Sequence, residues 1–63
     1  MTLQQIKQAV LSGQTVHWSN NSYQVVYNNG MWLIQCKNGH CVGLTWLDGV
    51  TLNGEENQFY IGE

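Results

Sequence analysis

Positive charge, proline and long apolar runs are all scarce in this sequence. Its 63 residues include no Pro and no Arg, and its only basic side chains besides His are Lys7 and Lys37. Nucleic-acid binding requires several Lys or Arg to neutralise phosphates, so two well-separated lysines on a chain of net charge −2 argue against a nucleic-acid partner. The same scarcity argues against binding to anionic membranes. We expect neither kind of partner.

The N-terminus lacks the basic and apolar regions of a signal peptide. No apolar run approaches the ~18 residues of a transmembrane helix. These two absences predict a cytoplasmic location, where thiols stay reduced.

The length predicts one domain, residues 1–63, near the lower size limit for a self-sufficient core. A chain of this size buries roughly 60% of the surface that its unfolded form exposes. Three Trp, three Tyr and one Phe supply much of the burial that offsets the entropy of folding. A monomer of this size can be stable, although a homodimer that shares core surface would be easier to stabilise.

Four turn-forming dipeptides follow one another closely in the second half of the chain. Asn and Gly tolerate the positive φ angles that tight hairpin turns require. The segments between the dipeptides are rich in Val, Ile, Leu, Trp, Tyr and Thr, which favour strands. The chain therefore predicts a β-meander whose tips are Asn29-Gly30, Asn38-Gly39, Asp48-Gly49 and Asn53-Gly54.

One helix is predicted at the N-terminus, over residues 2–12. Thr2 and Gln5 have the spacing of a capping box, and Gly13 stands where a glycine commonly ends a helix. Leu3, Ile6 and Val10 share one face of this helix. A helix of about three turns is marginal alone, so we expect its apolar face to pack on the sheet.

The predicted fold class is α+β, mostly β. The N-terminal helix packs on a twisted antiparallel β-meander (residues 14–62) of five or six short strands, either open or curled into a partial small barrel. The strands are expected at about residues 14–19, 22–28, 31–37, 40–47, 50–53 and 57–62.

Two-residue loops at every tip would fix the register of the strands. Trp18 would then face Tyr23, Tyr23 would face Cys36, and Cys36 would face Cys41. This row, with Val16, Val25, Ile34, Tyr27 and Trp32, lies on the face that we expect the helix to cover.

The opposite face carries more apolar side chains at one end than a solvated face needs. Either the sheet coils and buries them, or they form a surface for self-association or for a protein partner. This predicted interaction patch contains Val26, Met31, Leu33, Leu44 and Trp46.

Residues 36–41 (CKNGHC) are the one segment that invites a chemical interpretation. In the predicted register Cys36 and Cys41 are cross-strand neighbours on the core face, and His40 points to the other face. The two cysteines are then small buried hydrophobic residues with free thiols, a disulfide, or zinc ligands. The Cys-x₄-Cys spacing lacks a second ligand pair, so we predict that they are not metal ligands.

No other residues form a catalytic or cofactor-binding pattern. His17 has no Ser, Asp or second His placed near it by any sequence logic, and the glycines do not form a phosphate-binding loop. We expect no cofactor, no metal and no enzymatic activity.

The apolar and turn positions together resemble those of the short uncharacterised proteins of bacterial genomes, their phages and other mobile elements. This diffuse resemblance spans most of the chain, implies no activity and transfers no functional residue, but it favours a small accessory or inhibitor-type protein. It rests on Leu3-x-x-Ile6, Ala9-Val10, Gly13, Val16-His17-Trp18, Tyr23-x-Val25, Trp32-Leu33-Ile34, Gly43-Leu44-Thr45, Asp48-Gly49, Leu52-Asn53-Gly54 and Phe59-Tyr60-Ile61.

Two functional hypotheses follow. The favoured one is a non-enzymatic protein-interaction module that uses the apolar sheet face. The alternative is a small-molecule or carbohydrate binder, or a minimal enzyme, that uses an aromatic platform of Trp18, Tyr23, Tyr27 and Trp32 together with His17.

Overall fold

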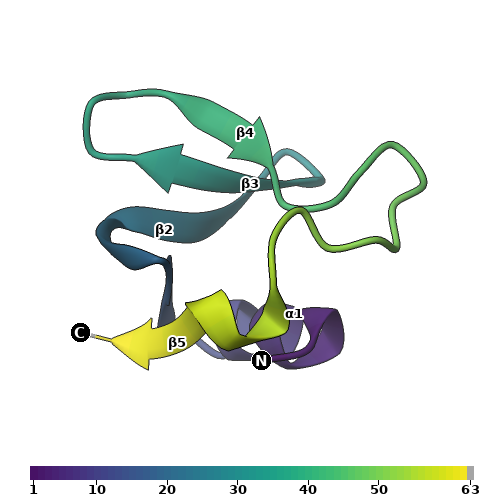
Figure 1. Cartoon of the computed structure of the whole chain (residues 1–63), viewed down its shortest axis with the longest axis horizontal. Helices are drawn as coiled ribbons and strands as arrows, with labels where there is room; N and C mark the ends of the chain where they lie inside the picture. Colours follow the sequence, from purple (N-terminus) through teal and green to yellow (C-terminus); the bar gives the residue numbers. More distant parts are fainter. Residues whose placement is uncertain (63) are drawn as a thin grey trace.

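A computed structural model describes residues 1–62 and confirms the predicted fold class: one N-terminal helix and an antiparallel sheet of five strands (Figure 1). No helix within residues 1–62 is long and apolar enough to cross a membrane. The elements, in chain order, are α1 (Leu3–Leu11), β1 (Thr15–Trp18), β2 (Asn20–Asn28), β3 (Met31–Cys36), β4 (Cys41–Gly43), a 3-10 turn η1 (Glu56–Gln58) and β5 (Phe59–Gly62).

The helix begins and ends as its sequence predicts. The hydroxyl of Thr2 accepts a hydrogen bond from the Gln5 backbone N–H at 3.2 Å, and the Thr2 N–H donates to Gln5 Oε1 at 2.9 Å. These two bonds form the capping box. Gly13 follows the helix with a φ of 90°, the left-handed conformation that glycine adopts most easily.

The strand order is β4-β3-β2-β1-β5, so the first four strands form a meander and the last returns to its far edge. β5 pairs antiparallel with β1, with Ile61 opposite Val16. The predicted strand at 50–53 is wrong, because only an isolated bridge between Thr45 and Leu52 forms there. β4 and β5 are the two edges of this five-stranded sheet, so the part of the chain that the structure describes does not close into a barrel.

The pairing of β2 with β3 follows the predicted register. Tyr23 lies opposite Cys36, Val25 opposite Ile34 and Tyr27 opposite Trp32. The Asn29-Gly30 tip is a two-residue loop in which both residues have positive φ, 52° and 78°. This is the geometry that the dipeptide favours.

The pairing of β1 with β2 departs from the prediction at its end. A register shift after His17 places Trp18 opposite Asn20, where the prediction had placed Tyr23. Ser19, at the turn, has a φ of 67°. The Trp18 and Tyr23 rings are nevertheless in contact, because their centroids are 4.9 Å apart.

The β3–β4 hairpin corrects the predicted register by one residue. Its loop contains three residues, 37–39, because the Cys36 N–H donates to the His40 carbonyl at 2.7 Å. Gly39, with a φ of 97°, supplies the left-handed position that a three-residue hairpin loop needs. Cys41 therefore lies opposite Gln35 rather than Cys36. A shift of one residue moves every following side chain to the other face of the sheet.

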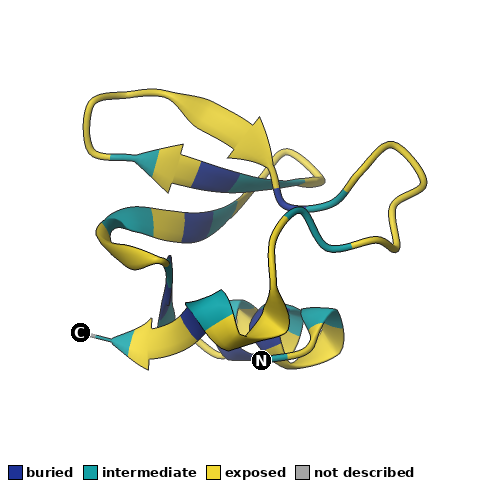
Figure 2. Ribbon diagram, viewed as in Figure 1, coloured by how far each residue is buried: buried dark blue, intermediate teal, exposed yellow. Residues whose placement is uncertain are grey.

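The core lies between the sheet and α1. Figure 2 shows buried positions as bands on β2, β3 and α1, while the turn between β3 and β4, β4 itself and the tip of the loop after β4 are exposed. Leu44 is fully buried, because the register shift turns it toward this core. The buried hydrophobic residues are Ile6, Ala9, Val16, Val25, Ile34, Leu44 and Phe59.

Candidate functional site

Three of the four most exposed large apolar side chains lie in the segment between Leu44 and Asn53, which extends from the body of the molecule (Figure 1). We call residues 45–52 the Trp46 loop. The Trp46 N–H donates to the Thr51 carbonyl at 2.8 Å, and the Gly49 N–H donates to the Trp46 carbonyl at 2.9 Å. The bridge between Thr45 and Leu52 closes the base of the loop. The loop therefore has an ordered backbone.

Asp48 organises the tip of the Trp46 loop. Its Oδ1 accepts hydrogen bonds from the backbone N–H groups of Val50 and Thr51, both at 2.9 Å. Its Oδ2 accepts from the Thr51 hydroxyl. The Thr51 side-chain bond and then the two backbone bonds lower the pKa of Asp48, because they favour the charged carboxylate.

Three large side chains around Asp48 face solvent. Leu47 is fully exposed, Val50 is 73% exposed and Trp46 is 65% exposed. Exposing single apolar side chains is normal for a soluble protein, but three on one ordered loop form a local apolar surface. The Trp46 loop is therefore the candidate interaction site.

We expect the loop to depend on the charge of Asp48. Because the pKa of Asp48 is lower in the folded chain, its carboxylate stabilises the loop fully at pH values above 3.8, the ordinary pKa of the group. This stabilisation is lost as the pH falls through the lower pKa of the folded chain. Amide exchange at Val50 and Thr51 should therefore stay slow from neutral pH to about 4 and then quicken, relative to intrinsic rates. Asp48→Ala should show the fast exchange at neutral pH. An identical pH profile for Asp48→Ala would contradict this role.

The predicted interaction patch is only partly assembled. Val26, Leu33 and Met31 lie on the sheet face opposite the core, as predicted; Val26 and Leu33 are half-buried, and Met31 is 58% exposed. Leu44 does not belong to the patch, because it is buried in the core. Trp46 is exposed, but on the loop rather than on a strand.

A second candidate site is a cavity on the core face of the sheet, which we call the aromatic cavity. Its volume is about 500 Å³. It lies beyond the part of the sheet that α1 covers, since α1 packs against β1 and β2 and contributes no lining residue. Its lining residues are Trp18, Tyr23, Ile34, Cys36, Asn38, His40, Val42 and Asn53.

The two cysteines do not form the predicted pair. Cys36 lines the aromatic cavity, whereas Cys41 lies opposite Gln35 and so belongs to the other face of the sheet. Both are free thiols, and side chains on opposite faces cannot be bridged without backbone movement. Within residues 1–62, no three His, Cys, Asp or Glu side chains are grouped so that they could hold a metal ion.

His17 is buried and lies away from the aromatic cavity. It is 7% exposed, and its Nδ1 donates to the Tyr23 carbonyl at 2.8 Å. The Tyr60 ring lies beside it, 5.5 Å away between centroids. A Cβ atom at Gly62 would stand 2.9 Å from its Nε2, so glycine leaves the room that the imidazole occupies. The close packing and the hydrogen bond to the backbone indicate a structural role for His17.

The predicted aromatic platform is divided into two pairs. Trp18 and Tyr23 contact one another in the aromatic cavity. Tyr27 and Trp32 pack together with centroids 4.6 Å apart, and Lys7 Nζ lies 5.6 Å from the Trp32 ring centroid. The alternative hypothesis required one pocket that contains all four aromatic residues and His17. Of these five residues, only Trp18 and Tyr23 line the aromatic cavity.

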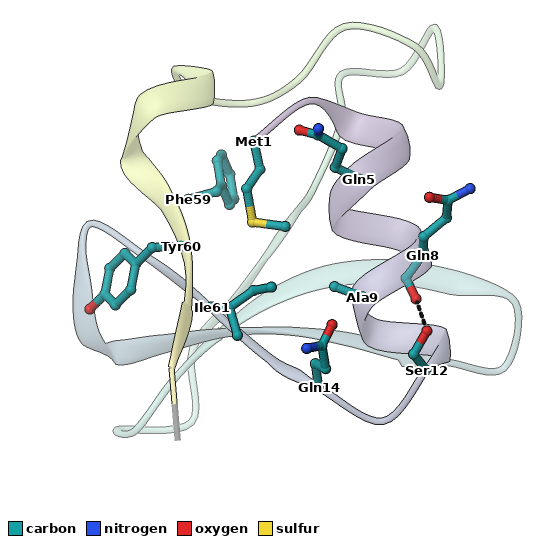
Figure 3. Close-up of a pocket in the computed structure, with 9 residues that line it drawn as sticks. All are labelled: Met1, Gln5, Gln8, Ala9, Ser12, Gln14, Phe59, Tyr60 and Ile61. Carbon is teal, nitrogen blue, oxygen red and sulfur yellow. Dashed lines mark hydrogen bonds between the residues drawn. The ribbon is translucent and has the colours of Figure 1, made fainter.

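An open depression of about 630 Å³ lies between α1 and β5. Figure 3 shows Met1, Phe59 and Ile61 between the two elements, with the ring of Tyr60 pointing away from the helix. Two polar groups at its rim already bond to α1: Gln5 Oε1 caps its start, and the Ser12 hydroxyl donates to the Gln8 carbonyl at 2.7 Å. Among residues 1–62, the depression has no charged lining side chain and no aromatic corner like that of the aromatic cavity.

Comparisons with protein-family models, with curated proteins and with solved structures found no match to this chain. The Trp46 loop and the aromatic cavity are therefore the features of this chain that bear on its function.

Proposed function

We propose that this chain is a small non-enzymatic interaction module that binds a protein partner through the Trp46 loop. The observation that carries the proposal is the full exposure of Leu47 between two other exposed apolar side chains, Trp46 and Val50, on an ordered loop. Aromatic residues are enriched among the side chains that dominate protein interfaces. A loop that is already ordered loses little conformational entropy on binding.

The partner surface would be an apolar pocket with few charges. Asp48, the one charged residue of the loop, already has its carboxylate oxygens bonded to residues 50 and 51. It therefore requires no basic residue from the partner. Burial of Trp46 and Leu47 would supply most of the binding free energy.

A capture experiment from a lysate of the protein's own host tests the proposal. The chain is immobilised as the native form and as Trp46→Asp, Leu47→Asp and Leu11→Asp. Leu11 is the matched control, since it is exposed at the end of α1 and is absent from the Trp46 loop. We expect a protein that the native and Leu11→Asp forms retain and that both loop variants lose.

All three substituted side chains are exposed, so the free energy of unfolding of each variant should lie within about 0.5 kcal/mol of that of the native chain. Amide spectra of each variant check this requirement. Retention of the same proteins by all four forms would contradict a role of the loop in binding. Concentration-dependent sedimentation of the native chain that both loop variants abolish would identify a second copy as the partner.

A further inference from the structure

We propose that the aromatic cavity is a binding site for a neutral pyranose sugar. Its volume of about 500 Å³ lies within the range of small-molecule sites, roughly 300–1,000 Å³. The site is distinct from the Trp46 loop, so this inference does not rest on the proposed interaction function.

The lining residues favour an uncharged ligand. None of them is Asp, Glu, Lys or Arg, and His40 is the one basic side chain among them. A ligand that brought a phosphate into the cavity would lose hydration and find at most this one imidazole as an ionic partner, which is costly. We therefore take the ligand class to be uncharged.

The aromatic rings favour a sugar over a flat aromatic ligand. Trp18 and Tyr23 meet at 78°, so they form a corner rather than a parallel slot between which a nucleobase could stack. The face of an aromatic ring is electron-rich and attracts positively polarised hydrogen atoms. The C–H bonds of a pyranose ring would present such hydrogen atoms to a ring face of this corner.

Two asparagine side chains can bind the hydroxyl groups of a sugar. Asn53 Nδ2 donates to the Gly43 carbonyl at 3.0 Å, and Asn38 Oδ1 accepts from the His40 N–H at 3.0 Å. Within the described residues, Asn53 Oδ1 and Asn38 Nδ2 have no protein partner, which leaves one acceptor and one donor. A sugar hydroxyl is both a donor and an acceptor and can pair with either.

Trp18 is held in place before any ligand arrives. Its Nε1 donates to Gln58 Oε1 at 3.2 Å, and the same oxygen accepts from the Glu55 N–H at 3.0 Å. A Cβ atom at Gly54 would stand 2.8 Å from Trp18 Nε1, so the backbone approaches the indole closely. A preordered aromatic wall reduces the entropy that binding costs.

The test is a titration of the ¹⁵N-labelled chain, observed by amide and indole resonances. The probes are methyl β-D-glucopyranoside, methyl β-D-galactopyranoside and N-acetyl-D-glucosamine, with D-glucuronate as a charged control and adenosine as a flat aromatic control. We expect saturable shifts of the Trp18 indole and the Asn53 side-chain amide with at least one neutral sugar. The Trp46 indole, outside the cavity, should not shift.

Two variants locate the binding. Asn53→Ala should weaken the sugar about 10-fold, the effect of one lost hydrogen bond of ordinary strength, whereas Asn57→Ala, outside the cavity, should not. Val42→Trp, at a half-exposed lining position, should block the cavity if Asn53→Ala does not fold. Unsaturable or absent shifts with all three neutral sugars would overturn the proposal, as would equal binding by Val42→Trp. Shifts with adenosine or glucuronate alone would also overturn it.

Discussion

Leu44→Ala is expected to lower the free energy of unfolding by about 2–5 kcal/mol, the range for removing a fully buried leucine. Leu44 has no exposed surface and belongs to the core cluster between the sheet and α1. A small domain lies toward the low end of the roughly 5–15 kcal/mol range of total stability, so the variant should lose a large share of its stability and unfold at a clearly lower urea concentration. Urea denaturation followed by circular dichroism measures the loss.

Leu47→Ala is the matched control for Leu44→Ala. The residue type is the same and the position is three residues away, but Leu47 is fully exposed on the Trp46 loop. Its substitution should change stability by no more than about 0.5 kcal/mol. An equally small loss of stability at the two positions would contradict the burial of Leu44. It would mean that β3 and β4 are joined by the two-residue loop predicted from the sequence, which places Leu44 on the solvent face.

The β3–β4 register is the failed prediction with the largest consequence for the core. Asn29-Gly30 and Asn38-Gly39 are the same dipeptide in similar surroundings, yet the first forms a two-residue loop and the second ends a three-residue loop. Both loops satisfy the preference of glycine for positive φ. Local turn chemistry could not choose between them, and the choice decided whether Leu44 or Gly43 faces the core.

The helix, by contrast, was predictable because its signals agree with one another. The Thr2 cap, the apolar face and the glycine after the last turn all indicate the same helix, Leu3–Leu11. The β2–β3 pairing was predictable for a similar reason, since alternation and turn type lead to one register.

The two candidate sites were harder to predict from the sequence than the helix and the β2–β3 pairing. The Trp46 loop was expected to continue into strands on both sides of Asp48-Gly49, because Trp, Leu, Val and Thr all favour strands. The three side-chain and backbone bonds to Asp48 instead stabilise a compact tip. The aromatic cavity depends on the short helix and on the return of the chain past Asn53, two long-range features that periodicity does not report.

The return of β5 to the sheet is the other long-range feature, and Phe59 anchors it. Phe59 is buried in the core, and its ring centroid is 6.5 Å from that of Trp18. The Ser19 N–H donates to the Gln58 carbonyl at 2.8 Å just before the strand begins. Without the Phe59 ring, few core contacts would hold the last strand against β1.

Phe59→Ala should therefore cost about 3–5 kcal/mol, the range for deleting a buried phenylalanine ring. Because β5 pairs with β1 from Trp18 to Thr15, amide exchange in both strands should quicken more than in β3. Ile61→Ala is the control: Ile61 lies on the same face of the same strand but is half exposed, so its loss should be about 1 kcal/mol. Denaturation by urea compares the two, and a Phe59→Ala loss no greater than that of Ile61→Ala would contradict the anchoring role of the ring.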